Sequence, residues 1–253
     1  MKPYILAGNT WKTIKDRKIE LAVLPWGATE AHNLHLPFST DNIMVEKIAD
    51  DSAARAWASG AGVIVLPFVP FGVNTGQMDV FLNINMNPST QFAILNDVAD
   101  VLNRHKISKF LILNGHGGND FRQMIRELGV KYPALFICCC NWFQVEGQND
   151  IFENGGGHAD EMETSVMQFI APGMVRPLDE AGEGKGKKFR IKAFNEKWAW
   201  AERAWTKVTN DTGIGDPGLS TPAKGEKYYN EVIMKVSSLM SELAAADINE
   251  MYE

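Results

Sequence analysis

Histidine and carboxylate side chains gather in three short segments of the sequence. In the first segment, Glu30 and His32 stand two positions apart, so both side chains face the same way in an extended chain. Asp41 follows at the expected start of a helix, which can return its carboxylate to the same point. One imidazole with two carboxylates is a ligand set that suits Zn²⁺, Mn²⁺ or Fe²⁺. The alternative is a surface loop in which Asp41 only caps the helix.

In the second segment, glycines surround His116 within the sequence Asn-Gly-His-Gly-Gly-Asn at 114–119. The segment follows an apolar run, and its glycines allow the backbone to approach a ligand closely. A phosphate-binding loop is the alternative, because glycine N–H groups at the start of a helix bind anions. The spacing matches neither of the common glycine-rich phosphate motifs, which do not require a histidine. The segment therefore favours His116 as a metal ligand.

The third segment, 155–165, runs from a glycine triplet through His158 into an acidic helix start. The helix dipole alone favours acids there, which is sufficient reason for Asp160 and Glu161. Glu163 lies one turn into an otherwise apolar helix, where a carboxylate is costly unless it is paired or bound to metal. Glu163 is therefore harder to explain by helix structure alone than the other acids of this segment, but the sequence does not decide between Glu163 and Glu161.

Together the three segments could hold two metal ions bridged by one carboxylate. The ligands that they offer are Glu30, His32, Asp41, His116 and Glu163. His158 is then left over as a general acid–base. No G-x-S-x-G motif of a serine hydrolase competes with this interpretation.

The elements around these segments follow the pattern of an α/β protein. Continuous apolar runs predict strands at 19–26, 62–67, 109–113 and 134–141. Helical patterns cover 41–57, 90–104, 121–128, 160–170 and 222–246, with Gly129 expected just past the end of the third. Apolar strands separated by helices predict a mostly parallel sheet with both faces covered. Such sheets bind ligands at the carboxyl ends of their strands, where the first two polar segments lie.

Composition argues against several classes of protein. The 253-residue chain carries a formal charge of −6 and no long basic run, which disfavours binding to nucleic acid or to an anionic membrane. No window approaches about 18 apolar residues, and the N-terminal region lacks the apolar core of a signal peptide, so we expect a cytoplasmic protein. The three cysteines, Cys138, Cys139 and Cys140, are adjacent in an apolar run, which predicts a buried strand without a disulfide.

We interpret 1–253 as a single domain with one irregular excursion at about 172–217. This stretch is rich in glycine and lysine and then in tryptophan, and it is too long for a simple connection. We expect it to carry a mobile lid or a contact between subunits. Trp198, Trp200 and Trp205 could serve either purpose, and the enrichment of tryptophan at protein interfaces favours the subunit contact.

The three segments, in this order, resemble motifs of the creatininase family, also called creatinine amidohydrolases. Positions 24–41 read LPWGATEAHNLHLPFSTD and are similar to the family segment L-P-x-G-(S/A)-x-E-x-H-G-x-H-L-P-x-x-T-D. Positions 114–119 match N-G-H-G-G-N, and HADEMETS at 158–165 is similar to H-A-G-x-x-E-T-S. A late GDP at 215–217 and AKGE at 223–226 extend the resemblance toward the end of the chain.

The resemblance implies a three-layer α/β/α sandwich with a mostly parallel sheet, assembled as a homo-oligomer such as a trimer or hexamer. It implies two divalent ions per chain, and a bridging water that attacks an amide-type C–N bond. The ligands that it carries over are Glu30, His32, Asp41 as the bridge, and His116. Gly118 stands where creatininase proper has its next glutamate, so the resemblance implies Glu163 as the fifth ligand, with Glu161 as the alternative. His158 matches the catalytic histidine of the family.

The expected reaction is the hydrolysis of a small cyclic amide, a formamide or an N-acyl substrate. The expected catalytic residues are His158 and Glu163, with His158 protonating the leaving nitrogen. Backbone N–H groups of Gly117 and Gly118 are expected to hold the oxyanion. Trp142, just after the fourth strand, is expected to form a wall of the pocket unless it packs in the core.

Departures from the family pattern bear on the substrate. Asn33 and Asp160 stand where the family has glycine. Positions 74–78 read NTGQM and lack the acid and histidine that line the pocket in many members, so creatinine is not the expected substrate. A catalytically inactive member of the same fold, binding a metal or another ligand, is the alternative function. Phosphoester cleavage is disfavoured because the basic residues available for a phosphate clamp are Lys185, Lys187 and Lys188 on a flexible stretch.

Overall fold

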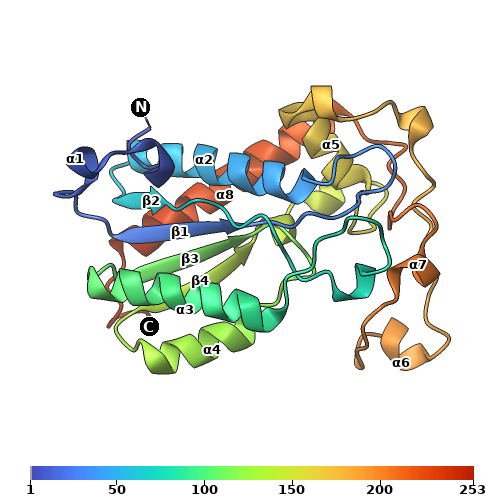
Figure 1. Ribbon diagram of the computed structural model, residues 1–253. Coiled ribbons are helices and arrows are strands. Elements are labelled where there is room, and N and C mark those ends of the chain that lie inside the picture. The colour runs from blue at the N-terminus through green and yellow to red at the C-terminus, as the bar shows by residue number, and fades with distance from the viewer. Residues whose placement is uncertain (1) are drawn as a thin grey trace.

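Four parallel strands form the centre of the molecule (Figure 1). The computed structural model describes residues 2–253, and within them the strands pair in the order β2-β1-β3-β4. Their bounds are Leu21–Trp26 for β1, Val63–Val65 for β2, Lys109–Asn114 for β3 and Phe136–Asn141 for β4. After β1 the chain forms β2 on one side of β1, and it then crosses to form β3 on the other side. The carboxyl ends of β1 and β3 therefore meet at a topological switch point, where sheets of this kind bind ligands.

Helices cover both faces of the sheet, which confirms the three-layer α/β/α sandwich (Figure 1). One face carries α2 (Thr40–Ala58), α5 (Glu161–Ile170) and α8 (Pro222–Ala245), and the other carries α3 (Pro88–Arg104) and α4 (Arg122–Lys131). Successive strand residues alternate between the two faces, as the pleat requires. The first core therefore includes Leu21, Val23, Leu111 and Leu113, and the second includes Ala22, Leu24, Phe110 and Ile112.

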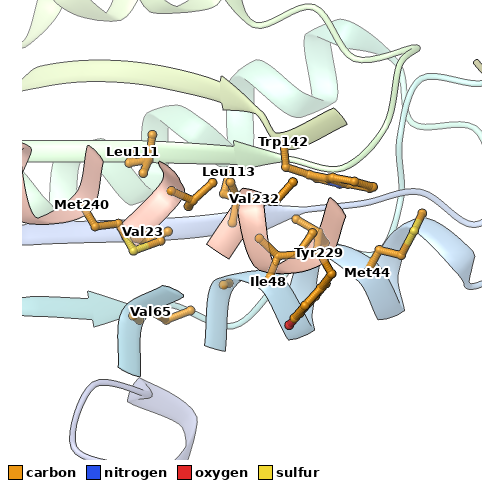
Figure 2. Packing of buried hydrophobic residues seen from close by; sticks show 14 of the residues in the cluster. Val23, Met44, Ile48, Val65, Leu111, Leu113, Trp142, Tyr229, Val232 and Met240 are labelled. Atoms are coloured by element: carbon orange, nitrogen blue, oxygen red, sulfur yellow. The ribbon is translucent and has the colours of Figure 1, made fainter. Parts of the chain in front are cut away.

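The larger core lies between the sheet and the pair α2 and α8 (Figure 2). Ile48 of α2 and Val232 of α8 lie beside Val23 of β1 in this core, and all three are completely buried. Apolar burial of this kind contributes about 25 cal/mol per Å² removed from water, so it fixes the helices firmly on the sheet. The starts of α2 and α5, which carry Asp41 and Glu163, are thereby held over the carboxyl end of the sheet.

Two local predictions are wrong. Gly129 does not end α4, because the Leu128 carbonyl still accepts the N–H of Tyr132 and the helix continues to Lys131. β4 is an edge strand, so Cys139 is exposed while Cys138 and Cys140 are half-buried. Burial raises the pKa of each of these thiols to about 11 or 12, which keeps them protonated and unreactive at neutral pH.

The stretch between α5 and α8 passes around the carboxyl end of the sheet (Figure 1). Its α-helices are only α6 (Lys192–Asn195) and α7 (Trp205–Val208) within the described residues. Asn33 ties this stretch to the first polar segment: its amide oxygen accepts the N–H of Gly182 at 2.8 Å, and its own N–H donates to Thr212 Oγ1 at 3.0 Å. Asn33 has a φ of 55°, which asparagine tolerates better than most residues. Asn33 thus stands where the family pattern has glycine, and its hydrogen bonds hold the stretch between α5 and α8 against the first polar segment.

No helix in residues 2–253 is both long enough and apolar enough to cross a membrane.

The packing of α8 on α5 yields a stability prediction. A Cβ added at Gly225 of α8 would lie 1.9 Å from the carbonyl oxygen of Ser165 in α5, so Gly225→Ala should lower the free energy of unfolding by about 1–3 kcal/mol. Gly129→Ala is the matched control, because a Cβ there meets nothing within 4 Å. It should raise the free energy of unfolding by about 0.5–1 kcal/mol. Urea unfolding measures both, and equal effects of the two substitutions would contradict the packing.

Candidate metal centre

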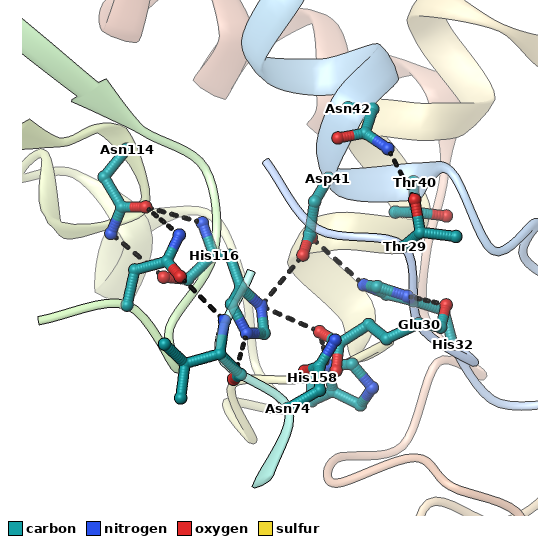
Figure 3. Close-up of polar contacts among 12 residues, drawn as sticks. Thr29, Glu30, His32, Thr40, Asp41, Asn42, Asn74, Asn114, His116 and His158 are labelled. Carbon is teal, nitrogen blue, oxygen red and sulfur yellow. Dashed lines mark hydrogen bonds and ion pairs between the residues drawn. The ribbon is translucent and has the colours of Figure 1, made fainter. Parts of the chain in front are cut away.

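The five predicted ligands meet at the carboxyl ends of β1 and β3. Figure 3 shows four of them: Glu30, His32, Asp41 and His116. Glu30 and His32 follow β1, and His116 follows β3. Asp41 and Glu163 lie in the first turns of α2 and α5, where the helix dipoles favour negative charge. All five side chains are buried. Two adjacent strands and two helix starts thus bring together ligands that lie up to 133 positions apart, from Glu30 to Glu163.

Asp41 is at the centre of the cluster, and its two oxygens face different histidines. Oδ1 lies 3.1 Å from His32 Nε2, and Oδ2 lies 3.0 Å from His116 Nδ1. Glu30 Oε1 lies 2.9 Å from the same nitrogen of His116, and Glu163 Oε2 lies 3.8 Å from His32 Nε2. The donors therefore form two groups of three that share Asp41, and within each group they lie within 4.8 Å of one another. A carboxylate placed in this way can bridge two ions.

Each histidine in the cluster is oriented by a backbone carbonyl. His32 donates from Nδ1 to the Glu30 carbonyl at 3.1 Å, and His116 donates from Nε2 to the Val73 carbonyl at 3.0 Å. His158 donates from Nε2 to the Ala31 carbonyl at 2.9 Å. An imidazole that donates from one nitrogen presents a lone pair on the other when it is neutral. This arrangement is typical of metal-ligating histidines.

The charges of the cluster also fit divalent cations. Burial raises the pKa of Glu163 to about 8, although the neighbouring His32 opposes the shift. Burial alone would lower the pKa of His32, but the carboxylates of Asp41, Glu163 and Glu30 outweigh it and raise that pKa to about 10. Glu163 therefore holds a proton at neutral pH in the metal-free protein, whereas the pKa values of Glu30 and Asp41 are lowered by the neighbouring histidines. The ionised carboxylates demand compensating positive charge, from protons on the histidines or from bound cations. Mixed carboxylate and imidazole ligands suit Zn²⁺, Mn²⁺ or Fe²⁺.

The structure separates the two glutamates between which the sequence could not decide. Glu161 Oε2 accepts the backbone N–H groups of Glu153 at 3.0 Å and Asn154 at 2.7 Å, and Glu161 Oε1 pairs with Lys224. Glu161 thus binds its own loop and α8, outside the candidate ligand groups. Glu163 is the glutamate of α5 that faces the cluster.

Asp160, the second departure from the family pattern, caps α5. Its Oδ1 accepts the N–H groups of Met162 and Glu163, and its Oδ2 accepts those of Gly156 and Gly157. An aspartate at this position satisfies backbone donors that a glycine would leave open, typically contributing about 1 kcal/mol to stability. It also fixes the loop that carries His158.

His158 lies at the edge of the cluster, and two roles are open to it. Its Nδ1 is 3.7 Å from Glu30 Oε1, and its ring centroid is 4.2 Å from that of His32. Glu30, His32 and His158 form a third group whose donor atoms lie within 4.8 Å, so His158 could itself be a ligand. Burial and then His32 lower the pKa of His158, which favours the neutral imidazole that an acid–base group needs at rest.

A cavity of about 370 Å³ opens beside the cluster. Gly117 and Gly118 line it as expected, and Gly118 is required for space, because a Cβ there would lie 2.3 Å from the Val73 carbonyl oxygen. Trp200 and Trp205 line it from the excursion. Trp142 does not: it is fully buried in the larger core (Figure 2), where it packs on Phe143 and Tyr228. The expected pocket wall is therefore a core residue.

Sequence reasoning missed one buried contact to a ligand. Gln77, in the loop after β2, donates to Glu30 Oε2, and Gln77 Oε1 accepts from Asn83 at 2.6 Å. This glutamine lies in the NTGQM stretch that lacks the expected acid and histidine. The signal that could have identified Gln77 was the difference between the NTGQM stretch and the family pattern, because a polar residue that replaces a site residue can take a different role there.

The fold and the cluster together define an α/β protein with a candidate metal centre at the switch point of its sheet. The family model for creatininase, described as creatinine amidohydrolase, matches residues 7–240. The chain therefore belongs to the creatininase family, as the motifs predicted.

Curated relatives and solved structures agree with this assignment. Mycofactocin precursor peptide peptidases are 23% identical over 234 residues in Mycobacterium tuberculosis H37Rv and 24% identical over 223 residues in Mycolicibacterium smegmatis. These alignments cover 83% and 85% of this chain and 80% and 82% of the relatives.

Among solved structures, a protein from Bacteroides fragilis NCTC 9343, provisionally named a creatinine amidohydrolase, is 42% identical over the full length of both chains with a TM-score of 0.93. A manganese form of creatininase has a TM-score of 0.80 at 18% identity, covering 96% of this chain and 99% of that one, and a Zn-Zn form of a creatininase variant has the same score and identity over 97% and 100%. At 18% identity, the similarity to these two structures shows a shared fold only.

The two glutamates of α5 give a matched test of the ligand assignment. Glu163→Gln removes a ligand from one of the two groups, so metal content should fall from about two ions per chain to about one. Glu161→Gln should leave metal content unchanged and lower stability, because it weakens an ion pair and two backbone contacts. Elemental analysis and thermal unfolding measure the two effects, and a Glu163→Gln variant with full metal content would contradict the assignment.

Metal affinity should rise with pH. His32 has a pKa of about 10 in the metal-free protein, so it carries a proton at neutral pH that a metal ion must displace. Affinity for Zn²⁺ should therefore rise about tenfold per pH unit for each proton displaced, between about pH 6.5 and about pH 8. Calorimetry in buffers of different ionisation enthalpy counts the released protons. His105→Ala is the control, because His105 is exposed at the end of α3, and a pH-independent affinity would contradict the prediction.

Proposed function

We propose that this protein is an amidohydrolase that uses two divalent metal ions to hydrolyse the C–N bond of a small amide. The observation that carries the proposal is the position of Asp41, whose two oxygens face two separate ligand groups. Ions held by these groups would supply an acidified water as the nucleophile and would polarise the carbonyl of the amide. Zn²⁺, Mn²⁺ and Fe²⁺ are the candidates, and the presence of all five ligands argues against the inactive alternative.

His158 is the residue that we propose to move protons. Its Nε2–H is held by the Ala31 carbonyl, so Nδ1 is the nitrogen that can accept a proton on the side of Glu30. The edge-to-face contact with Trp205, at 5.4 Å and 89°, fixes the plane of the ring. An imidazole with a lowered pKa accepts a proton only transiently and can deliver it to the departing nitrogen.

Two further contacts prepare the site. Gln77 holds Glu30 by donating to the oxygen that does not face His116, which fixes the orientation of the carboxylate. Gly117 and Gly118 line the cavity without side chains, so their backbone N–H groups are the proposed donors to the oxyanion. Mutation of such donors elsewhere typically costs about 10²- to 10³-fold in kcat.

The proposed substrates are N-acyl compounds, formamides and small cyclic amides. A cavity of about 370 Å³ has room for a group of that size. A second candidate is a peptide bond near the end of a chain, which is favoured by the curated relatives, whose names describe peptidases of a precursor peptide. The NTGQM loop does not favour creatinine, because it presents Gln77 where an acid and a histidine were expected.

Metal dependence and a substrate panel test the proposal together. Protein purified without chelator should contain about two transition-metal ions per chain and hydrolyse at least one class of amide. His158→Ala should keep the ions and lower kcat by about 10²- to 10⁴-fold. Loss of an ion in this variant would make His158 a ligand, and undiminished turnover would remove it from the mechanism.

Two results would contradict the proposed function. Metal-loaded protein that hydrolyses no amide, formamide or short peptide with any of the three metals would favour the inactive alternative. Protein that binds no metal would contradict the centre itself, since its ligands would then be only structural.

A further inference from the structure

Arg203 lines the same cavity as the candidate ligands. The acidic residues in the cavity lining are Glu30, Asp41, Asp120, Glu163 and Glu202. Within the described part of the chain, Arg203 is the only lysine or arginine that lines it. A single fixed cation in an otherwise acidic cavity marks one position where a negative group of a ligand can bind.

The Arg203 guanidinium is held by a fixed aromatic ring. Its central carbon lies 4.5 Å from the centroid of the Trp205 ring, a distance typical of a cation–π contact. Trp205 is buried, and its Nε1 donates to the Thr212 carbonyl at 2.9 Å. The other neighbour of Trp205 is His158, which it meets edge to face. Trp205 therefore connects Arg203 to the residue that we propose to move protons.

The Arg203 guanidinium has no acceptor in residues 2–253: no carboxylate lies within 4.0 Å of it, and none of its side-chain nitrogens donates a hydrogen bond. The adjacent carboxylate of Glu202 has other partners: its Oε2 accepts from Thr75 Oγ1 at 3.0 Å, and its Oε1 accepts the backbone N–H of Arg203 at 3.3 Å. Partial burial lowers the pKa of Arg203, yet the residue as a whole is exposed and a ligand can reach it. A partly desolvated guanidinium without a partner leaves up to five N–H donors for a ligand.

The loop after β2 contacts both the backbone of Arg203 and the candidate ligand Glu30. A Cβ at Gly76 would lie 2.3 Å from the Arg203 carbonyl oxygen and 2.6 Å from Glu202 Oε1, so only glycine allows this approach. The next residue, Gln77, donates to Glu30. One short loop thus supports both the cation and a metal ligand, which fixes the spacing between them.

We propose that Arg203 is a specificity-determining residue that binds a free carboxylate of the substrate. The substrates would be N-acyl amino acids or short peptides with a carboxylate close to the scissile C–N bond. Guanidinium and carboxylate form two parallel hydrogen bonds in one plane, which gives both affinity and orientation. This inference rests on the proposed function, because it assumes that the amide is bound in the same cavity.

The test compares N-acyl amino acids and dipeptides with their C-terminal carboxamides, which lack the negative charge. Metal-loaded wild type should prefer the free acids. Arg203→Gln should raise Kd and KM for the free acids by about 10- to 100-fold and leave those of the carboxamides unchanged. Metal content should be unaffected, because Arg203 belongs to none of the candidate ligand groups. Arg203→Lys should restore part of the preference, since lysine keeps the charge and loses the planar fork.

Arg190→Gln is the matched control, because Arg190 is an exposed arginine of the same stretch that lies outside this cavity. Equal binding of acids and carboxamides by wild type, equal weakening of both by Arg203→Gln, or no binding of either would each overturn the proposal. The proposed function fails separately: a preference for free acids in calorimetry without hydrolysis of any compound would support the carboxylate site and contradict the amidohydrolase.

Discussion

The burial of the carboxyl groups of Glu30, Asp41 and Glu163 in one cluster is the constraint on which the rest of this structure depends. Each of these groups can be ionised there only with compensating positive charge. The fold supplies part of it through the starts of α2 and α5, whose dipoles point at Asp41 and Glu163. His32 and His116 face different oxygens of these carboxyl groups, and backbone carbonyls fix which nitrogen each histidine presents. The arrangement is therefore prepared for cations. It lies at the switch point of the parallel sheet, because the polar segments that follow the strands meet there.

Much of this centre could be predicted from sequence because its determinants are local. The alternation of apolar runs and helices specifies a parallel sheet, and the polar segments follow its strands. The choice between Glu161 and Glu163 could not be made, because both lie in the first turn of α5 and only the position of α5 against α8 decides which one faces the cluster. The role of Trp142 was open for a similar reason: an aromatic residue after a strand can turn to the core or to the ligand, and its neighbour Tyr228 lies 86 residues further along the chain, in α8.

The excursion at about 172–217 had no readable pattern, and the structure explains why. Its α-helices are single turns, and it is held by contacts to distant segments rather than by a periodic apolar face. The Asn33 amide bonds Gly182, and Ile214 exchanges two backbone hydrogen bonds with His158, at 2.9 and 3.2 Å. The conformation of such a segment is determined by its contacts with distant residues, which cannot be inferred from its own sequence pattern. Trp198 and Trp200 are both exposed, and their expected role in a subunit contact stays a prediction.

Family membership and substrate choice therefore rest on different parts of this chain. The ligands come from segments with recognisable motifs, fixed to the sheet and to helix starts. The walls of the cavity come from the NTGQM loop and from the excursion, which depart from the family pattern or have none. These two parts are in contact: Gly76 allows the backbone of Arg203 to approach, while Gln77 reaches the ligand Glu30. A change in the loop would thus alter the position of the cavity wall and the orientation of a ligand together. This coupling would allow the candidate ligands to stay in place while the cavity changes, provided that the loop and the excursion change together.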